Sequence, residues 1–172
     1  MIDRRRFVKA GGGLAALLPL VPFAGHAGDT VEIAMAGRDQ GAHVWFDPAG
    51  IRIEPGQTVR WTNRDPGNSH TATSYHPDLY GRPLRMPKAA APFDSDLLLP
   101  GESFSVQLSV PGVYDYYCIP HEHAGMVGRI VVGSPGGESR PDAADGGDLP
   151  EIALAAFPPV GEIMAKGTVR RK

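Results

Sequence analysis

The chain of 172 residues is long enough for one domain with short appendages, and a 42% share of hydrophobic residues is sufficient to form a core. Its formal net charge of -2 excludes a strongly basic surface of the kind that binds nucleic acids. The 22 glycines and 17 prolines indicate many turns between short strands, and the single cysteine excludes an internal disulfide bond.

The first 27 residues have the pattern of an export signal. Arginines at positions 4–6 precede an apolar stretch over 10–22, and small residues follow up to Ala27. The paired arginines followed by Phe7 and Lys9 resemble the twin-arginine signal, whose cargo crosses the membrane already folded. An N-terminal membrane anchor is the less favoured alternative, because the apolar stretch is short and interrupted by prolines. We therefore expect a periplasmic or otherwise exported protein that is cleaved after Ala27 and keeps no stable membrane span.

Residues 28–133 are expected to form one β domain. Seven short segments alternate apolar with polar residues or are rich in β-branched and aromatic residues, and turn signals containing proline and glycine separate them. These segments are 30–36, 44–46, 51–53, 58–62, 103–110, 113–118 and 127–132. The pattern predicts an all-β fold, a Greek-key β-sandwich of seven to eight strands with antiparallel pairing. The irregular, proline-rich segment 75–100 is expected to run over one edge of the sandwich.

The chain beyond this domain divides into two parts. Residues 134–148 contain glycine, proline, serine and acidic residues with almost no apolar side chain, which predicts a flexible linker. Residues 149–172 turn apolar, and short helices are expected over 151–157 and 160–166. The sequence leaves open whether this helical tail docks on the sandwich or moves freely.

The one cysteine lies in a segment rich in metal-binding side chains. Cys118, His121 and Met126 place a thiolate, an imidazole and a thioether within nine residues. Thiolate and thioether suit Cu(I), and imidazole suits both Cu(I) and Cu(II). A second imidazole from a neighbouring strand would complete a site for one copper ion with two histidines, one cysteine and one methionine. His70, which follows the segment 58–62, is the best-placed candidate.

These segments resemble the plastocyanin and pseudoazurin branch of the cupredoxins, the type 1 blue copper proteins. The similarity rests on the run from Gly112 through Cys118 and His121 to Ile130, on Asn68-Ser-His70, and on the turn at Pro55. It covers residues 29–133, the expected cupredoxin domain. The family spaces its ligands as Cys, two residues, His, four residues, Met, and this chain keeps that spacing. The resemblance therefore implies that the copper ligands are His70, Cys118, His121 and Met126.

One residue departs from the family pattern. The position after the first histidine ligand is commonly Asn, which ties the two ligand loops together, whereas this chain has Thr71. A hydroxyl can also form a hydrogen bond, but contacts around a metal site tune the metal. The substitution therefore bears on the reduction potential.

Several other side chains are weaker candidates. His123 competes with His121, because its spacing from Cys118 occurs in some cupredoxins with longer loops, but the spacing to Met126 favours His121. His43 and His76 are expected at the surface or at an edge. The remaining candidates are expected to serve packing or to be solvated: Met86, Asp94 and Asp96.

The resemblance implies a periplasmic one-electron carrier. Its partners would be transient redox proteins that bind through a small, partly apolar patch. The alternative is a copper carrier or copper sensor without an electron-transfer role, which Met86 and His123 support. Enzyme activity is not expected, because four protein ligands leave no coordination position for a substrate.

Overall fold

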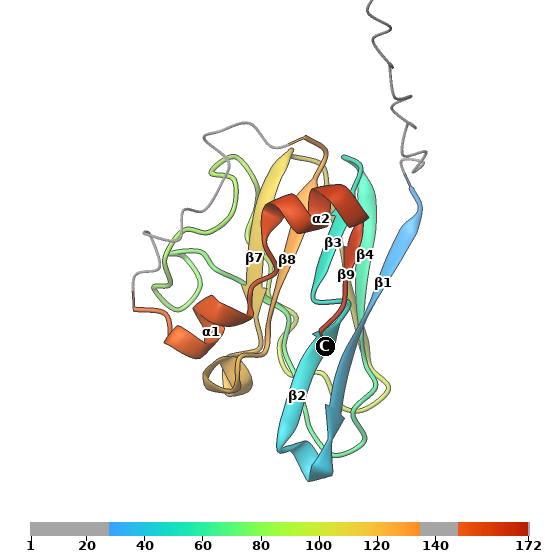
Figure 1. Ribbon diagram of the computed structural model, residues 1–172, viewed down its shortest axis with the longest axis vertical. Coiled ribbons are helices and arrows are strands. Elements are labelled where there is room, and N and C mark those ends of the chain that lie inside the picture. The colour runs from blue at the N-terminus through green and yellow to red at the C-terminus, as the bar shows by residue number, and fades with distance from the viewer. Residues whose placement is uncertain (1–27, 135–147, 172) are drawn as a thin grey trace, which may run out of the picture.

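Two β-sheets packed against each other make up the body of the protein (Figure 1). The computed structural model describes residues 28–134 and 148–171, so the expected export signal (1–27) and nearly all of the expected linker (134–148) lie outside the described residues. One sheet has the strand order β2-β1-β4-β6 and the other the order β5-β7-β8-β3-β9. The strands are β1 (Thr30–Arg38), β2 (His43–Asp47), β3 (Gly50–Ile53), β4 (Gln57–Asn63), β5 (Thr73–Ser74), β6 (Ser103–Leu108), β7 (Gly112–Tyr117), β8 (Val127–Val132) and β9 (Thr168–Val169).

The predicted β-sandwich is confirmed, and each of the seven predicted segments contains a strand. The pairing is mixed rather than antiparallel throughout, since β1 pairs with β4 and β3 pairs with β8 in parallel. The reason is the path of the chain, which leaves the first sheet after β2, forms β3 in the second sheet and returns as β4. Parallel neighbours need such a crossover, whereas a hairpin joins antiparallel ones.

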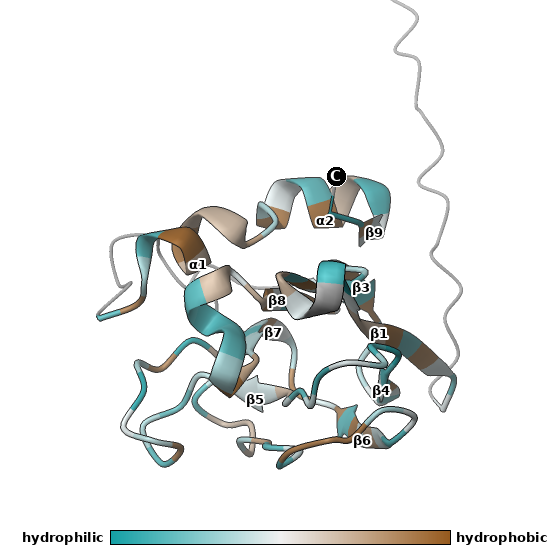
Figure 2. Ribbon diagram, turned by 90° about the horizontal axis from the view of Figure 1, so that it is seen from below, coloured by the Kyte–Doolittle hydropathy of each residue, from teal (hydrophilic) through white to brown (hydrophobic). Residues whose placement is uncertain are grey.

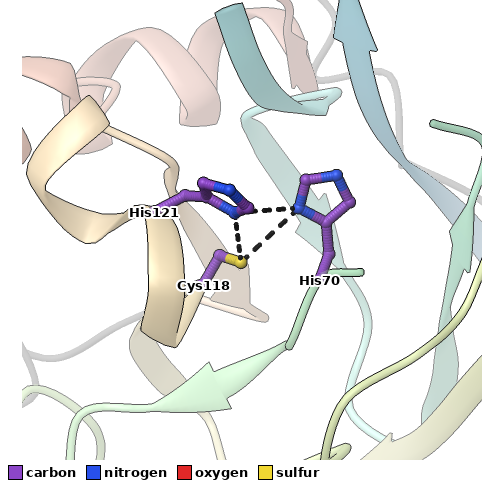
Figure 3. A group of neighbouring side chains, drawn as sticks. All are labelled: His70, Cys118 and His121. Carbon is purple, nitrogen blue, oxygen red and sulfur yellow. Dashed lines mark hydrogen bonds between the residues drawn. The ribbon is translucent and has the colours of Figure 1, made fainter. Parts of the chain in front are cut away.

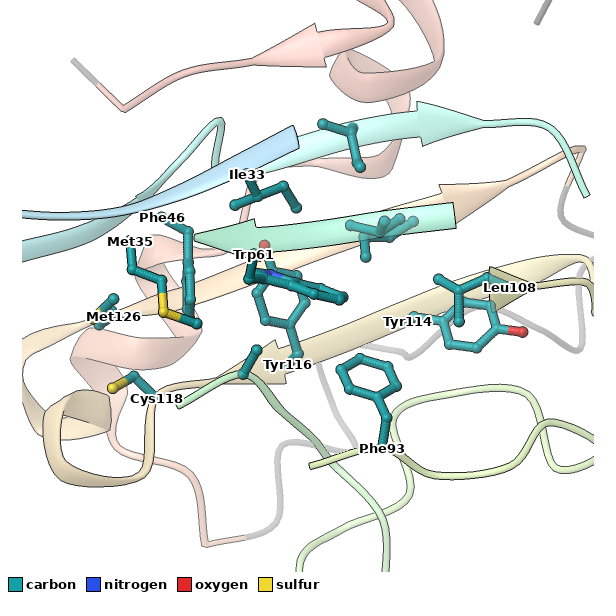
Figure 4. Close-up of a cluster of buried hydrophobic side chains, with 14 of the residues drawn as sticks. Ile33, Met35, Phe46, Trp61, Phe93, Leu108, Tyr114, Tyr116, Cys118 and Met126 are labelled. Carbon is teal, nitrogen blue, oxygen red and sulfur yellow. The ribbon is translucent and has the colours of Figure 1, made fainter. Parts of the chain in front are cut away.

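The core lies between the two sheets and is rich in aromatic side chains (Figure 4). The register of β1 on β4 sets Ile33 beside Trp61. The Trp61 ring lies 5.3 Å from the rings of both Tyr116 and Phe93, measured between centroids. Such aromatic contacts add to the free energy gained by removing apolar surface from water. Cys118 lies at one end of this core, so the sandwich supplies a rigid, buried base for the segment that follows β7.

The C-terminal tail docks on the outer face of the second sheet. The expected helices are present as α1 (Glu151–Ala156) and α2 (Val160–Lys166), and β9 pairs with β3 beyond them. Figure 2 shows α2 on the outer side of β8 and β3, away from β4 and β6. The buried contacts of the tail are made by Leu149, Ala153, Phe157 and Ile163. Within the described residues, no helix combines the length and the apolar character that a membrane span needs.

Candidate metal centre

The segment between β7 and β8 folds into a tight loop that carries three of the four expected ligands. Its central part is a 3-10 helix, η2 (Ile119–Ala124), which ends at Gly125. The φ angle of Gly125 is 75°, a left-handed conformation that glycine adopts without a steric cost. The loop closes on itself because the Cys118 N–H donates to the Met126 carbonyl at 3.0 Å and the Met126 N–H to the His121 carbonyl at 3.1 Å.

His70 reaches the same place from the segment between β4 and β5. Its N–H donates to the Leu98 carbonyl at 3.1 Å and its carbonyl accepts from the Leu98 N–H at 2.8 Å. These two bonds fix the backbone of His70 to the segment that precedes β6. The side chain of His70 is completely buried, whereas that of His121 is partly exposed.

Three ligand atoms converge between these two segments (Figure 3). His70 Nδ1 lies 3.2 Å from His121 Nδ1, and Cys118 Sγ lies 3.6 Å from His70 Nδ1 and 3.4 Å from His121 Nδ1. Two nitrogens at about 2.0 Å and one sulfur at about 2.3 Å from a tetrahedral metal ion would stand about 3.3 to 3.5 Å apart. The spacing of the three atoms therefore fits a single metal ion, and a thiolate with two imidazoles suits copper.

The ring of His70 is oriented by a carboxylate that the sequence patterns did not predict. Asp65 Oδ2 lies 3.1 Å from His70 Nε2, on the side of the ring that faces away from the cluster. A carboxylate accepts hydrogen bonds, so the proton of a neutral His70 lies on Nε2 and the lone pair of Nδ1 points toward Cys118 and His121. Burial acts to raise the pKa of Asp65, but hydrogen bonds from Asn68, Gly67 and His70 outweigh it and the pKa lies below its ordinary value. Asp65 is therefore ionised at neutral pH.

Burial also governs the protonation of the three ligand atoms. It raises the pKa of the Cys118 thiol to about 11, although hydrogen bonds from the Thr71 and His121 backbones act in the opposite direction. A metal ion must therefore displace a proton from this sulfur. Burial lowers the pKa of His70 and of His121, and the neighbouring His70 lowers that of His121 further. Both imidazoles are neutral above pH 7, the form that binds metals.

Thr71 forms the link between the two ligand segments that the family makes with Asn. Its N–H donates to Cys118 Sγ at 3.3 Å, and its hydroxyl accepts from the Ile119 N–H at 2.9 Å. The same hydroxyl lies 2.9 Å from Thr73 Oγ1, which donates to Asp94 Oδ1 at 2.8 Å. The hydroxyl of Thr71 thus holds the η2 loop against the segment that carries His70.

Met126 and His123 occupy contrasting positions. Met126 is completely buried and lies with Cys118 at the same end of the core (Figure 4), whereas His123 is exposed on η2. Among the described residues, His70, Cys118 and His121 are the only group of three or more His, Cys, Asp or Glu side chains whose ligand atoms lie within 4.8 Å of one another.

The histidine and aspartate candidates His43, His76, Asp94 and Asp96 do not belong to this group. Met86 packs in the core, and His43 is exposed. His76 is partly exposed. Asp94 accepts hydrogen bonds from Thr73 and Tyr80.

A second buried carboxylate anchors the loop from its other side. Glu122 lies between the two histidines of η2 and is 4% exposed. It accepts a hydrogen bond from the Tyr75 hydroxyl at 2.7 Å and pairs with Arg82. No sequence pattern indicated this role, because a glutamate between two histidines normally lies in solvent. Glu122 ties η2 to the irregular segment that begins at Tyr75.

A sandwich with two imidazoles and one thiolate clustered at one end of its core defines the cupredoxin class of copper proteins. Residues 32–133 match the family described as copper binding proteins of the plastocyanin/azurin family. The chain belongs to this family, as its sequence predicted, and the family together with the donor set supports one copper ion as the cofactor.

Individual relatives agree with this assignment. The chain is 38% identical to a chloroplastic plastocyanin of Chlamydomonas reinhardtii over 128 residues, which cover 74% of this chain and 82% of the relative. It is 36% identical to a plastocyanin of Scenedesmus fuscus over 96 residues, or 56% of this chain and 93% of the relative. Among solved structures, a Sinorhizobium pseudoazurin matches with a TM-score of 0.57 and 29% identity, covering 80% of this chain and 95% of the pseudoazurin.

Proposed function

We propose that this chain is a one-electron carrier that binds one copper ion through His70, Cys118, His121 and Met126. The observation that carries the proposal is the convergence of His70 Nδ1, Cys118 Sγ and His121 Nδ1 at separations of 3.2, 3.4 and 3.6 Å. Copper bound there supplies a couple between Cu(I) and Cu(II) that exchanges one electron with a partner. The buried thioether of Met126 would supply the fourth donor of the proposed site.

The residues around the cluster suit electron transfer because they restrict the movement of the ligand atoms and exclude water from them. His70, Cys118 and Met126 are all 0% exposed, so water is excluded from most of the site. Asp65, Thr71 and the closed backbone of the η2 loop restrict movement of the donors. A site that changes little between oxidation states exchanges electrons with a small reorganisation cost. Four protein ligands leave no position for a substrate, so we propose that the chain is not an enzyme.

His121 is the proposed point of electron exchange, since it is the one partly exposed side chain of the three clustered ligands. An apolar patch, formed by Tyr80, Leu97, Ile119 and Pro120, includes the residue just before it in the sequence. With Thr71 and Asp96 this patch lines a cleft of about 600 Å³. Tyr80 is 64% and Leu97 61% exposed, which is unusual for large apolar side chains in one place. A small patch of this kind suits brief contacts with redox proteins.

The test is spectroscopic. The copper(II)-loaded chain is expected to show an intense thiolate absorption band at about 600 nm and a type 1 electron-spin-resonance signal. Cys118→Ser should lose the band while circular dichroism still reports a folded β protein. Retention of the band in Cys118→Ser would contradict the ligand assignment.

The two histidines of η2 provide a matched comparison for the same test. His121→Ala should remove the band, and His123→Ala should leave it in place, because only His121 points at the cluster. Loss of the band in His123→Ala alone would assign the ligand to the other imidazole.

A copper carrier or sensor is the second candidate function, favoured by the exposed imidazole of His123 two residues from His121. The exchange of Cu(I) with a soluble chelator separates the two candidates. An electron carrier should release Cu(I) slowly and show the blue band when oxidised. A colourless protein that exchanges Cu(I) within seconds would favour copper handling.

We also propose a layout for the whole chain. Residues 1–27 are a twin-arginine-type export signal that sends the protein to the periplasm, 28–133 the cupredoxin domain, 134–148 a flexible linker and 149–172 the helical tail. The charged and apolar order of residues 1–27 supports the signal. The intact mass of the exported protein is expected to match a chain that begins at Gly28.

A further inference from the structure

The contact between Asp65 and His70 places a negative charge inside the protein, directly behind a proposed copper ligand. Asp65 is 3% exposed and His70 is completely buried. Burying a carboxylate is costly unless its oxygens are hydrogen-bonded. Here Oδ1 accepts from the Gly67 N–H at 2.9 Å, and Oδ2 accepts from Asn68 Nδ2 at 2.8 Å and faces His70 Nε2 at 3.1 Å. The carboxylate is therefore well enough held to remain ionised beside the ring.

The location of this carboxylate is set by β1 as well as by its own loop. A Cβ atom added at Gly37 would overlap Asp65 Oδ2, so the carboxylate occupies the space that a side chain at position 37 would take. Asn63 fixes the start of the loop, because its side-chain oxygen accepts from the Asp65 N–H at 2.9 Å. Two strands that pair with each other thus determine where the charge lies.

We propose that Asp65 is a positioning residue that fixes His70 with Nδ1 toward the metal and lowers the reduction potential of the copper site. This inference rests on the proposed electron-carrier function and extends it. The ion carries one more positive charge when oxidised than when reduced, and a buried anion that acts through the imidazole stabilises the oxidised form more. The couple takes one electron from a redox protein partner. A neutral acceptor at the same place would orient the ring but would supply no full charge.

The experiment compares two charge-neutralising variants of the full copper-loaded chain at pH 7. Asp65→Asn keeps the size of the side chain and removes the charge, and its midpoint potential is expected to rise above that of the unaltered protein. Asp78→Asn is the matched control, because Asp78 carries the same charge on a side chain that is 80% exposed. Its potential should change far less, since solvent and salt screen an exposed charge. An unchanged or lowered potential in Asp65→Asn, or equal shifts in the two variants, would overturn the proposal.

A second variant keeps the Asp65 charge and changes only its position. Gly37→Ala keeps Asp65 but forces its carboxylate away from its present place. The potential should again rise, and nuclear magnetic resonance of the Cu(I) form should show faster solvent exchange of the His70 Nε2 proton. If Asp65→Asn fails to fold, Gly37→Ala decides the matter, and an unaltered potential with a slowly exchanging proton would refute the proposal. An unaltered protein without the blue band would instead refute the proposed function itself.

Discussion

Thr71 connects three parts of the candidate metal centre through a single residue. Its backbone bonds to the Cys118 sulfur, and its hydroxyl accepts from Ile119 and reaches the hydroxyl of Thr73. Thr73 donates to Asp94, so the hydrogen between the two threonines belongs to Thr71. The backbone bond does not depend on the side chain, whereas the link to η2 does. The two roles of Thr71 are therefore separable by mutation.

Replacement of Thr71 by alanine should weaken the protein without removing its colour. Thr71→Ala removes the acceptor of the part-buried hydrogen bond from the Ile119 N–H, which costs about 1 kcal/mol of unfolding free energy. Thr71→Ser keeps the acceptor and should recover most of that loss. Urea unfolding of the metal-free protein measures both. Equal stability of the alanine and serine variants would show that the hydroxyl does not hold the loop.

At the scale of elements, one of the contacts that attach the C-terminal tail is an aromatic side chain packed against two cations. The Phe157 ring lies 5.2 Å from the Arg85 guanidinium and 5.0 Å from that of Arg129. Asp115 is completely buried and pairs with both arginines, and Arg129 also donates to the Pro158 carbonyl at 3.0 Å. Arg85, Arg129 and Asp115 form a socket for the Phe157 ring, and this contact binds the end of α1 to β7 and β8.

Truncation of Phe157 should release α1 from the sandwich. A buried phenylalanine replaced by alanine typically costs about 3 to 5 kcal/mol, and here the loss falls on tail docking. Phe157→Ala should therefore speed amide hydrogen exchange in α1 while exchange in β4 stays slow. Ile152→Ala on the same helix is the control, because Ile152 is 49% exposed. Similar exchange of α1 in both variants would argue against the socket.

At the scale of the whole molecule, the sandwich buries ionisable tyrosines along with its apolar core. Burial raises the pKa of Tyr114 and that of Tyr117 to about 12. An unfolded chain loses these protons near pH 10, whereas the folded chain keeps them until about pH 12. The contribution of both groups to stability is complete below pH 10 and is lost as the pH rises through 12.

Alkaline conditions should therefore unfold the protein in a way that depends on these phenols. The free energy of unfolding, measured by urea titration of the metal-free protein, is expected to fall between pH 10 and pH 12. Tyr114→Phe removes one of the groups and should make this fall less steep. A stability that stays constant across this range would contradict the expectation.

The sequence predicted those features of the fold and the site that depend on local patterns. Alternation and turn signals located β1 and β4, because core-facing side chains in these strands alternate with less buried ones. The two-residue strands β5 and β9 were missed, since their existence depends on pairing with distant segments. The parallel pairing of β1 with β4 was missed because strand patterns contain no direction.

The candidate site divides in the same way. Cys118 and His121 belong to one short spaced segment, and His70 was the best-placed second imidazole, a choice that the family resemblance also implied. Asp65 and Glu122 were missed, because their roles depend on segments that fold against them. The sequence Asp65-Pro-Gly-Asn68 does indicate a turn just before His70. A carboxylate at the start of such a turn could have indicated a hydrogen-bond partner for the His70 ring.

Tyr117 immediately precedes Cys118, and its ring stacks on Tyr75 with a centroid separation of 4.4 Å. It is 3% exposed, since the tail packs over this face of β7 with Ala153 and Phe157. An α-helix with its side chains is about 10 Å across, so the tail keeps a partner protein about that far from Tyr117. In the proposed carrier this covered side of the strand is closed to a partner protein, so we expect electrons to be exchanged on the side where His121 is partly exposed.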